Sequence, residues 1–176
     1  MFFLKKKRIE VYAPISGEVI SIEKVEDPVF SNKMLGDGFA IIPKKGKETK
    51  EATFIAPISG VLTTILDTGH AYGITEKSTK VECLIHIGMD TVELNGNGFS
   101  AKVHKEDKVV ANDTPLVAVN LDTMKKNNKD LTTPVIFTKE TIAEQGYKIN
   151  ILKFGQVKAG DVVAELVKAP ERAEIS

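Results

Sequence analysis

The chain has 176 residues, and its 24 basic and 24 acidic side chains give a formal net charge of zero. This length fits a single domain, and the balanced charge offers no basic surface for the phosphate backbone of a nucleic acid. One cysteine, Cys83, excludes an intramolecular disulfide and favours a reducing, cytoplasmic setting, while the lack of a run of about 18 apolar residues argues against a transmembrane helix.

The first eight residues, MFFLKKKR, place apolar side chains before a basic cluster. This is the reverse of a secretory signal, so we expect residues 1–8 to form a flexible segment, with a weak peripheral contact at the inner face of the membrane as the second reading. We expect one domain over residues 9–168 and a short tail over 169–176. The initial methionine and the short tail favour a free-standing protein over a piece excised from a fusion.

Short β-branched segments separated by Gly, Pro, Asn and Asp recur along the chain. Such spacing predicts an all-β sandwich or barrel. The predicted strands are Ile9–Tyr12, Gly17–Ile22, Phe39–Pro43, Thr53–Ala56, Gly60–Leu66, Val81–Ile87, Phe99–Val103, Leu116–Asn120, Thr133–Ile136, Lys148–Ile151 and Val162–Val167. Helical patterns are confined to 121–127 and 139–144, Gly36-Asp37-Gly38 is interpreted as a turn, and the charged run 44–50 as a hairpin loop.

Two pairs of segments echo each other. The pentapeptide APISG occurs at 13–17 and again at 56–60, each time before a similar apolar pattern. Segment 105–119 matches segment 153–167 at five positions, including an Ala-x-Asp turn in each. These echoes indicate an internal duplication.

The alternation in Val81–Ile87 places Val81, Cys83, Ile85 and Ile87 on one face of a strand. Glu82, Leu84 and His86 then lie on the other face. We therefore predict that Cys83 is a buried small hydrophobe and that His86 lies outside the core.

The same argument, applied to 61–70 as a nearly extended segment, places Leu66, Thr68 and His70 on one face. Two imidazoles, a hydroxyl and two leucines could then converge on a shallow surface. Phosphoryl transfer requires a nucleophile and donors around the transferred group. A histidine nucleophile with a second histidine and a threonine as donors meets this requirement.

Three segments, APISGEVISIEKVEDPVFSNKMLGDGFAIIP, APISGVLTTILDTGHAYGI and HIGMDTVELNGNGF, carry a close resemblance to a known family. They resemble enzyme IIA of the glucose class in the phosphoenolpyruvate-dependent sugar phosphotransferase system, over about Ile9 to Val167. The resemblance implies an antiparallel β-sandwich with duplicated halves, the duplicated hybrid motif.

The resemblance also implies roles for the site residues. His86 matches the histidine that accepts phosphate on Nε2 from phospho-HPr and passes it to a cysteine of a IIB domain. His70 matches the second histidine of the site, and Thr68 the threonine that orients it. The Gly88 carbonyl is expected to accept the Nδ1 proton of His86 and fix its tautomer.

A partner surface is implied as well. Asp27 and Asp90 match acidic positions that face a basic residue of HPr. An apolar ring around the site corresponds to Val29, Phe30, Met34, Leu35, Leu66 and Leu84. Phe30 is expected to be exposed, because its neighbours are polar and turn-like, whereas Met34, Leu35 and Leu66 could equally pack inward.

Three other functions compete with that of a phosphocarrier. A zinc hydrolase of related fold would need three protein ligands, and the required motifs are missing; His104 reads as a surface residue. A lipoate or biotin carrier would need an exposed lysine at a hairpin tip, typically beside Met or Ala, and no such tripeptide stands out in the sequence. A purely regulatory binding protein remains compatible with the sequence. No cofactor is expected, although zinc could bridge His70 and His86 together with a carboxylate of a partner.

Overall fold

The computed structural model describes residues 8–46 and 49–169. The expected N-terminal segment, the C-terminal tail and the charged loop 44–50 lie wholly or partly outside these residues. Arg8 already belongs to the first strand.

The described chain folds into one eight-stranded sheet and two three-stranded sheets, and all strand pairs are antiparallel. The eight-stranded sheet has the order β13 (Gly155–Val157), β2 (Gly17–Ser21), β3 (Gly36–Pro43), β11 (Thr133–Thr138), β7 (Glu82–His86), β6 (Ala71–Thr75), β5 (Gly60–Ile65) and β9 (Lys108–Val109).

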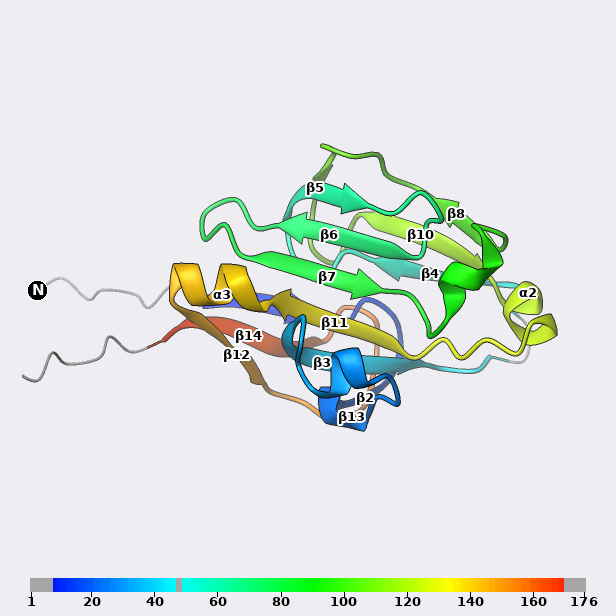
Figure 1. Cartoon of the computed structure of the whole chain (residues 1–176), viewed down its shortest axis with the longest axis horizontal. Helices are drawn as coiled ribbons and strands as arrows, with labels where there is room; N and C mark the ends of the chain where they lie inside the picture. The colour runs from blue at the N-terminus through cyan, green and yellow to red at the C-terminus, as the bar shows by residue number, and fades with distance from the viewer. Residues whose placement is uncertain (1–7, 47–48, 170–176) are drawn as a thin grey trace, which may run out of the picture.

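The smaller sheets lie toward opposite corners of the view in Figure 1. One, at the lower left, contains β1 (Arg8–Tyr12), β14 (Val162–Lys168) and β12 (Tyr147–Ile151). The other, at the upper right, contains β4 (Glu51–Ile55), β10 (Pro115–Asn120) and β8 (Phe99–Ala101). The expected antiparallel β-sandwich is confirmed.

Helices are few and short. They are α1 (Pro28–Ser31), α2 (Leu121–Lys126), α3 (Lys139–Gln145) and the 3-10 turns η1 (Ile22–Lys24) and η2 (Thr91–Leu94). The two predicted helices correspond to α2 and α3, whereas α1 was expected as part of a turn. No helix among residues 8–46 and 49–169 is long and apolar enough to cross a bilayer.

All eleven predicted strands are present within a few residues of their expected bounds, but three short ones were missed: β6, β9 and β13. The prediction of a turn at Gly36-Asp37-Gly38 was wrong, because these residues open β3. A Cβ atom on Gly36 or Gly38 would lie only 1.9 or 2.0 Å from a carbonyl oxygen of β11. The glycines therefore allow close approach of two strand backbones, a known use of glycine in sheets.

The internal duplication is visible in the hydrogen bonds. Ser16 of the first APISG accepts the backbone N–H of Ala159, and Ser59 of the second APISG accepts that of Ala111. Each serine thus joins its own pentapeptide to one of the two echoing Ala-x-Asp turns. The sheet order is also symmetric, because β11 and β7 pair at its centre and each is followed outward by three strands of one half.

Two apolar clusters lie on opposite faces of the eight-stranded sheet. The main core takes the odd-numbered side chains of the central strands, among them Cys83 and Ile85 of β7 and Val135 of β11. A smaller cluster contains Ala40, Ile136 and three residues of the covering segment, Ile22, Val25 and Phe30. Since strand side chains alternate between faces, His86 lies on the side of this smaller cluster.

Candidate active site

His86 ends β7 at the centre of the large sheet. Cys83, Ile85 and Ile87 are fully buried, while Leu84 and His86 are only partly buried. The predicted alternation of this strand is confirmed, as is the burial of Cys83, which raises the pKa of its thiol above the usual range. His86 therefore presents its imidazole on the face opposite the main core.

His70 reaches the same place by a different route from the one expected. β5 ends at Ile65, and residues 66–69 form a tight turn in which the N–H of Gly69 donates to the carbonyl of Leu66. The prediction of an extended chain through Gly69 was wrong. His70 instead precedes β6, and its carbonyl accepts the N–H of Ile87 at 2.7 Å.

The two imidazoles lie edge to face. Their ring centroids are 5.1 Å apart and the ring planes make an angle of 80°. His70 is almost entirely buried, with 3% of its surface exposed. His86 is therefore the more accessible of the two imidazoles, and the buried His70 ring packs against it.

The tautomer of His86 follows from its hydrogen bond. Nδ1 lies 2.8 Å from the carbonyl oxygen of Gly88, and a carbonyl can only accept. Nδ1 must therefore carry the proton, which leaves a lone pair on Nε2. This contact with Gly88 was expected from the sequence.

Thr68 makes the expected contact with His70, through a short hydrogen bond between Oγ1 and Nδ1. When the hydroxyl donates to Nδ1, the neutral ring carries its proton on Nε2. His70 can then donate a hydrogen bond from Nε2, while Nε2 of His86 offers a lone pair.

Burial favours the neutral form of both imidazoles. Burial lowers the pKa of His86, although the hydrogen bond to Gly88 and the charges of Asp27 and Asp90 act in the opposite direction. Burial, and then the neighbouring His86, lowers the pKa of His70. A neutral imidazole is the form that can act as a nucleophile.

Phe30 does not lie where it was expected. It is 4% exposed and packs with Ile22, Val25 and Ile136 in the smaller cluster. Its ring centroid is 5.1 Å from that of His86. The prediction of an exposed Phe30 was wrong, because α1 folds back and turns this side chain onto the outer face of the sheet.

The other apolar positions that the sequence analysis expected around the site are more exposed than Phe30. Val29, Met34, Leu35 and Leu66 expose 39%, 63%, 42% and 43% of their surface, whereas Leu84 is partly buried against the smaller cluster. Val92 on η2, which the sequence did not single out, is 52% exposed. Exposed apolar side chains such as these are available for contact with a partner.

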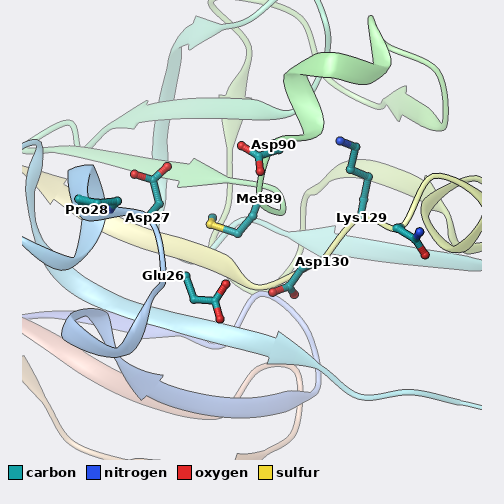
Figure 2. Close-up of a pocket in the computed structure, with 8 residues that line it drawn as sticks. Glu26, Asp27, Pro28, Met89, Asp90, Lys129 and Asp130 are labelled. Atoms are coloured by element: carbon teal, nitrogen blue, oxygen red, sulfur yellow. The ribbon is translucent and has the colours of Figure 1, made fainter.

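An open hollow of about 460 Å³ adjoins the site and is rich in carboxylates (Figure 2). Its lining is Glu26, Asp27, Pro28, Met89, Asp90, Asn128, Lys129 and Asp130. Among the described residues of this lining, Lys129 is the only cation, and it is paired with Glu93 on η2. The hollow therefore offers a negative surface next to His86.

The sequence predicted Asp27 and Asp90 but not the other lining residues. Asp27 also caps α1, since its Oδ1 accepts the N–H of Val29 at 2.9 Å. Lys129 and Asp130 lie in a loop before β11, far from His86 along the chain, and no local pattern marks them. Only the pairing of β11 with β7 brings this loop to the site.

A metal site would need more ligands than the two histidines supply. Within the part of the chain that the structure describes, no group of three or more His, Cys, Asp or Glu side chains is placed to hold an ion.

Comparisons with known proteins agree with these observations. Residues 9–143 match the family model for the phosphoenolpyruvate-dependent sugar phosphotransferase system, EIIA 1. The chain is 46% identical over 166 residues to the glucose-specific EIIA component of Mycoplasma capricolum, covering 94% of this chain and 99% of that protein. It is 41% identical over 153 residues to the glucose-specific EIICBA component of Staphylococcus carnosus, covering 87% of this chain and 21% of that protein.

A solved structure, the glucose permease IIA from Mycoplasma capricolum, superposes with a TM-score of 0.79 at 43% sequence identity. The superposition covers 94% of this chain and 99% of that one. The similarity thus extends over both halves of the duplicated fold.

Proposed function

Because the chain belongs to the EIIA 1 family of the phosphoenolpyruvate-dependent sugar phosphotransferase system, and so is a phosphocarrier in sugar uptake, we propose that His86 is the residue that carries the phosphate. The observation that carries this proposal is the hydrogen bond from Nδ1 of His86 to the Gly88 carbonyl. It leaves the Nε2 lone pair free as a nucleophile on the partly exposed face of the sheet. Family membership also favours this function over a zinc hydrolase.

In the proposed reaction, Nε2 of His86 attacks the phosphorus of phospho-HPr. A new N–P bond forms as the bond between the phosphorus and HPr breaks. A cysteine thiolate of a IIB domain then attacks the same phosphorus, forms an S–P bond and returns a neutral His86. The name of the Staphylococcus carnosus relative, EIICBA, supports a B part as the acceptor.

His70 is proposed to remain unphosphorylated and to donate from Nε2 to a phosphoryl oxygen. Its burial and its hydrogen bond to Thr68 support this role, because they fix the ring before the phosphate arrives. A donor that is already in position costs little reorganisation during the transfer.

The partner surface is proposed to combine the acidic hollow with the exposed apolar side chains. Asp27 and Asp90 would face a basic side chain of HPr, and Val29, Met34, Leu35 and Leu66 would surround the contact. A flat, rigid sheet face suits a carrier that docks two partners in turn. Such an exchange would take place in the cytoplasm, where the single buried thiol of Cys83 would stay reduced.

The proposal is tested by incubating the protein with enzyme I, HPr and phosphoenolpyruvate, followed by mapping of acid-labile phosphate by mass spectrometry. We expect phosphate on His86, none in His86→Ala, and normal labelling in His104→Ala, which removes an exposed histidine away from the site. Normal labelling of His86→Ala would contradict the assignment.

The role of His70 is tested by separating the two half-reactions. His70→Ala should still accept phosphate from phospho-HPr but pass it slowly to a IIB domain, because a donor used mainly in the transition state is missing. Phosphate mapped to His70 in the wild type would reverse the two roles.

A further inference from the structure

The turn that follows β7 holds the acceptor of the His86 proton through a chain of hydrogen bonds. The Gly88–Met89 peptide uses its carbonyl oxygen to accept from Nδ1 of His86, at 2.8 Å. The N–H of the same peptide donates to the carbonyl of Asp130, also at 2.8 Å. One peptide plane therefore connects the imidazole to the loop before β11.

That loop is itself fixed by the Asp130 side chain. Its Oδ1 accepts both the N–H and the hydroxyl of Thr132, each at 2.8 Å. Thr132 is 8% exposed and leads directly into β11, so this end of the loop is anchored in the sheet. The local turn made by the carboxylate determines where the Asp130 carbonyl points.

A second contact joins the loop to the segment beyond the turn. Nζ of Lys129 lies against the carboxylate of Glu93 on η2, and the Lys129 side chain is only 12% exposed. The space around Gly88 is also filled, since a Cβ atom there would lie 2.9 Å from the Asp130 carbonyl oxygen. The loop and the turn therefore pack as one unit, and Asp130 lies below and to the right of Met89 in Figure 2.

We propose that Asp130 is a positioning residue for His86, acting through the Gly88–Met89 peptide to hold the imidazole in the tautomer with its proton on Nδ1. This proposal rests on the assignment of His86 as the phosphate carrier. The peptide accepts and donates at the same time, so each hydrogen bond polarises the other and makes the Gly88 carbonyl a better acceptor. Loss of the Asp130 turn would release the peptide and let Nε2 become protonated, which removes the nucleophile.

Asp130 also lines the acidic hollow, so its charge could instead serve partner docking. The two roles predict different results for conservative substitution. Asp130→Asn removes the charge but keeps a side-chain oxygen that can accept from Thr132. Asp130→Ala removes both the charge and the acceptor.

The test is nitrogen NMR of the His86 imidazole in the unphosphorylated protein, which reports how the proton is distributed between Nδ1 and Nε2. We expect the Nδ1-to-Nε2 ratio to fall about two- to tenfold in Asp130→Ala, the effect of losing about one hydrogen bond. Asp130→Asn should keep the wild-type ratio. An unchanged ratio in Asp130→Ala, or an equal fall in both variants, would overturn the proposal.

Asp161→Ala provides a matched control, because Oδ2 of Asp161 accepts the N–H of Lys158 in a turn elsewhere in the fold. It should leave the His86 ratio unchanged, and a fall equal to that of Asp130→Ala would indicate general loosening and count against the proposal. If Asp130→Ala does not fold, Thr132→Val removes one of the two hydrogen bonds and should give a smaller fall; no fall there would also overturn the proposal. Phosphate mapped to another residue would refute the carrier role of His86. The NMR ratio would still decide whether Asp130 positions the His86 ring, because it is measured without phosphate.

Discussion

At the scale of single residues, Phe30 connects the stability of the fold to the site. Its ring is buried in the smaller apolar cluster and contacts the His86 imidazole. The Phe30 ring therefore limits the movement of the imidazole toward α1. It is a packing residue and not part of the exposed partner surface.

Phe30→Ala should lower the free energy of unfolding by about 3–5 kcal/mol, because it removes a buried aromatic ring and leaves a cavity. Phe30→Leu fills much of that space and should cost clearly less. Chemical denaturation of both variants measures the difference. A loss below about 1 kcal/mol in Phe30→Ala would show that Phe30 is exposed and not part of the core.

The two histidines should also make stability depend on pH. Their pKa values are lowered in the folded protein, so between those values and about 6.5 the unfolded chain binds more protons than the folded one. The contribution of the two neutral histidines to the free energy of unfolding should therefore be fully present above about pH 6.5. It should be lost as the pH falls toward their pKa values in the folded protein.

This dependence can be measured by denaturation from pH 8 to pH 5 in the presence of a chelator. His70→Ala should flatten the curve, whereas His104→Ala should leave it as in the wild type. The opposite outcome would be a stability that rises on acidification in the wild type but not in His70→Ala. It would show that the folded protein favours the charged form of His70.

At the scale of elements, the turn between β7 and η2 determines the geometry of the site. Gly88 adopts a φ angle of +78°, and a Cβ atom there would lie 2.7 Å from Cγ2 of Thr91. The Thr91 hydroxyl donates to the carbonyl of Ile87 at 2.6 Å, so this side chain cannot move away freely. The turn thus has both a conformational and a steric need for glycine.

Gly88→Ala should destabilise the protein by more than the roughly 1–2 kcal/mol that a left-handed conformation costs by itself. Gly146→Ala is the matched control, because Gly146 also has a positive φ, +68°, but a Cβ atom there would meet nothing within 4 Å. Denaturation measures both losses, and NMR of the His86 ring should change only in Gly88→Ala. Equal losses would mean that the turn can relax around a methyl group.

At the scale of the whole molecule, the acidic hollow lies beside His86, since the charges of Asp27 and Asp90 in its lining act on the imidazole. Four carboxylates line the hollow, and Lys129 in the same lining is paired with Glu93. A basic partner would therefore be attracted toward the site before contact is made.

The double variant Asp27→Asn, Asp90→Asn should slow phosphate transfer from HPr through its association rate, most strongly at low salt, where screening is weakest. Asparagine keeps the cap on α1 and tolerates the left-handed backbone of Asp90, whose φ is +55°. Stopped-flow transfer at several salt concentrations tests this, with Asp113→Asn as a control on an exposed turn. An unchanged association rate would show that HPr does not dock at Asp27 and Asp90.

Local patterns in the sequence were sufficient for much of this fold. Alternation alone placed Cys83 and His86 on opposite faces of one strand, because strand side chains point to opposite sides in turn. The two APISG segments and their Ala-x-Asp echoes indicated the duplication, which the matching bonds of Ser16 and Ser59 reflect.

The tertiary structure decided what depends on contacts between distant segments. The polar neighbours of Phe30 predicted exposure, but α1 folds onto β3 and β11 and buries the ring. His70 reaches the site through a turn and not along an extended strand, and Asp130 comes near Gly88 only because β11 pairs with β7. A chain segment sets its own turns and faces through its neighbours, whereas which strands pair is decided by burial over the whole molecule, and this pairing brings the site residues together.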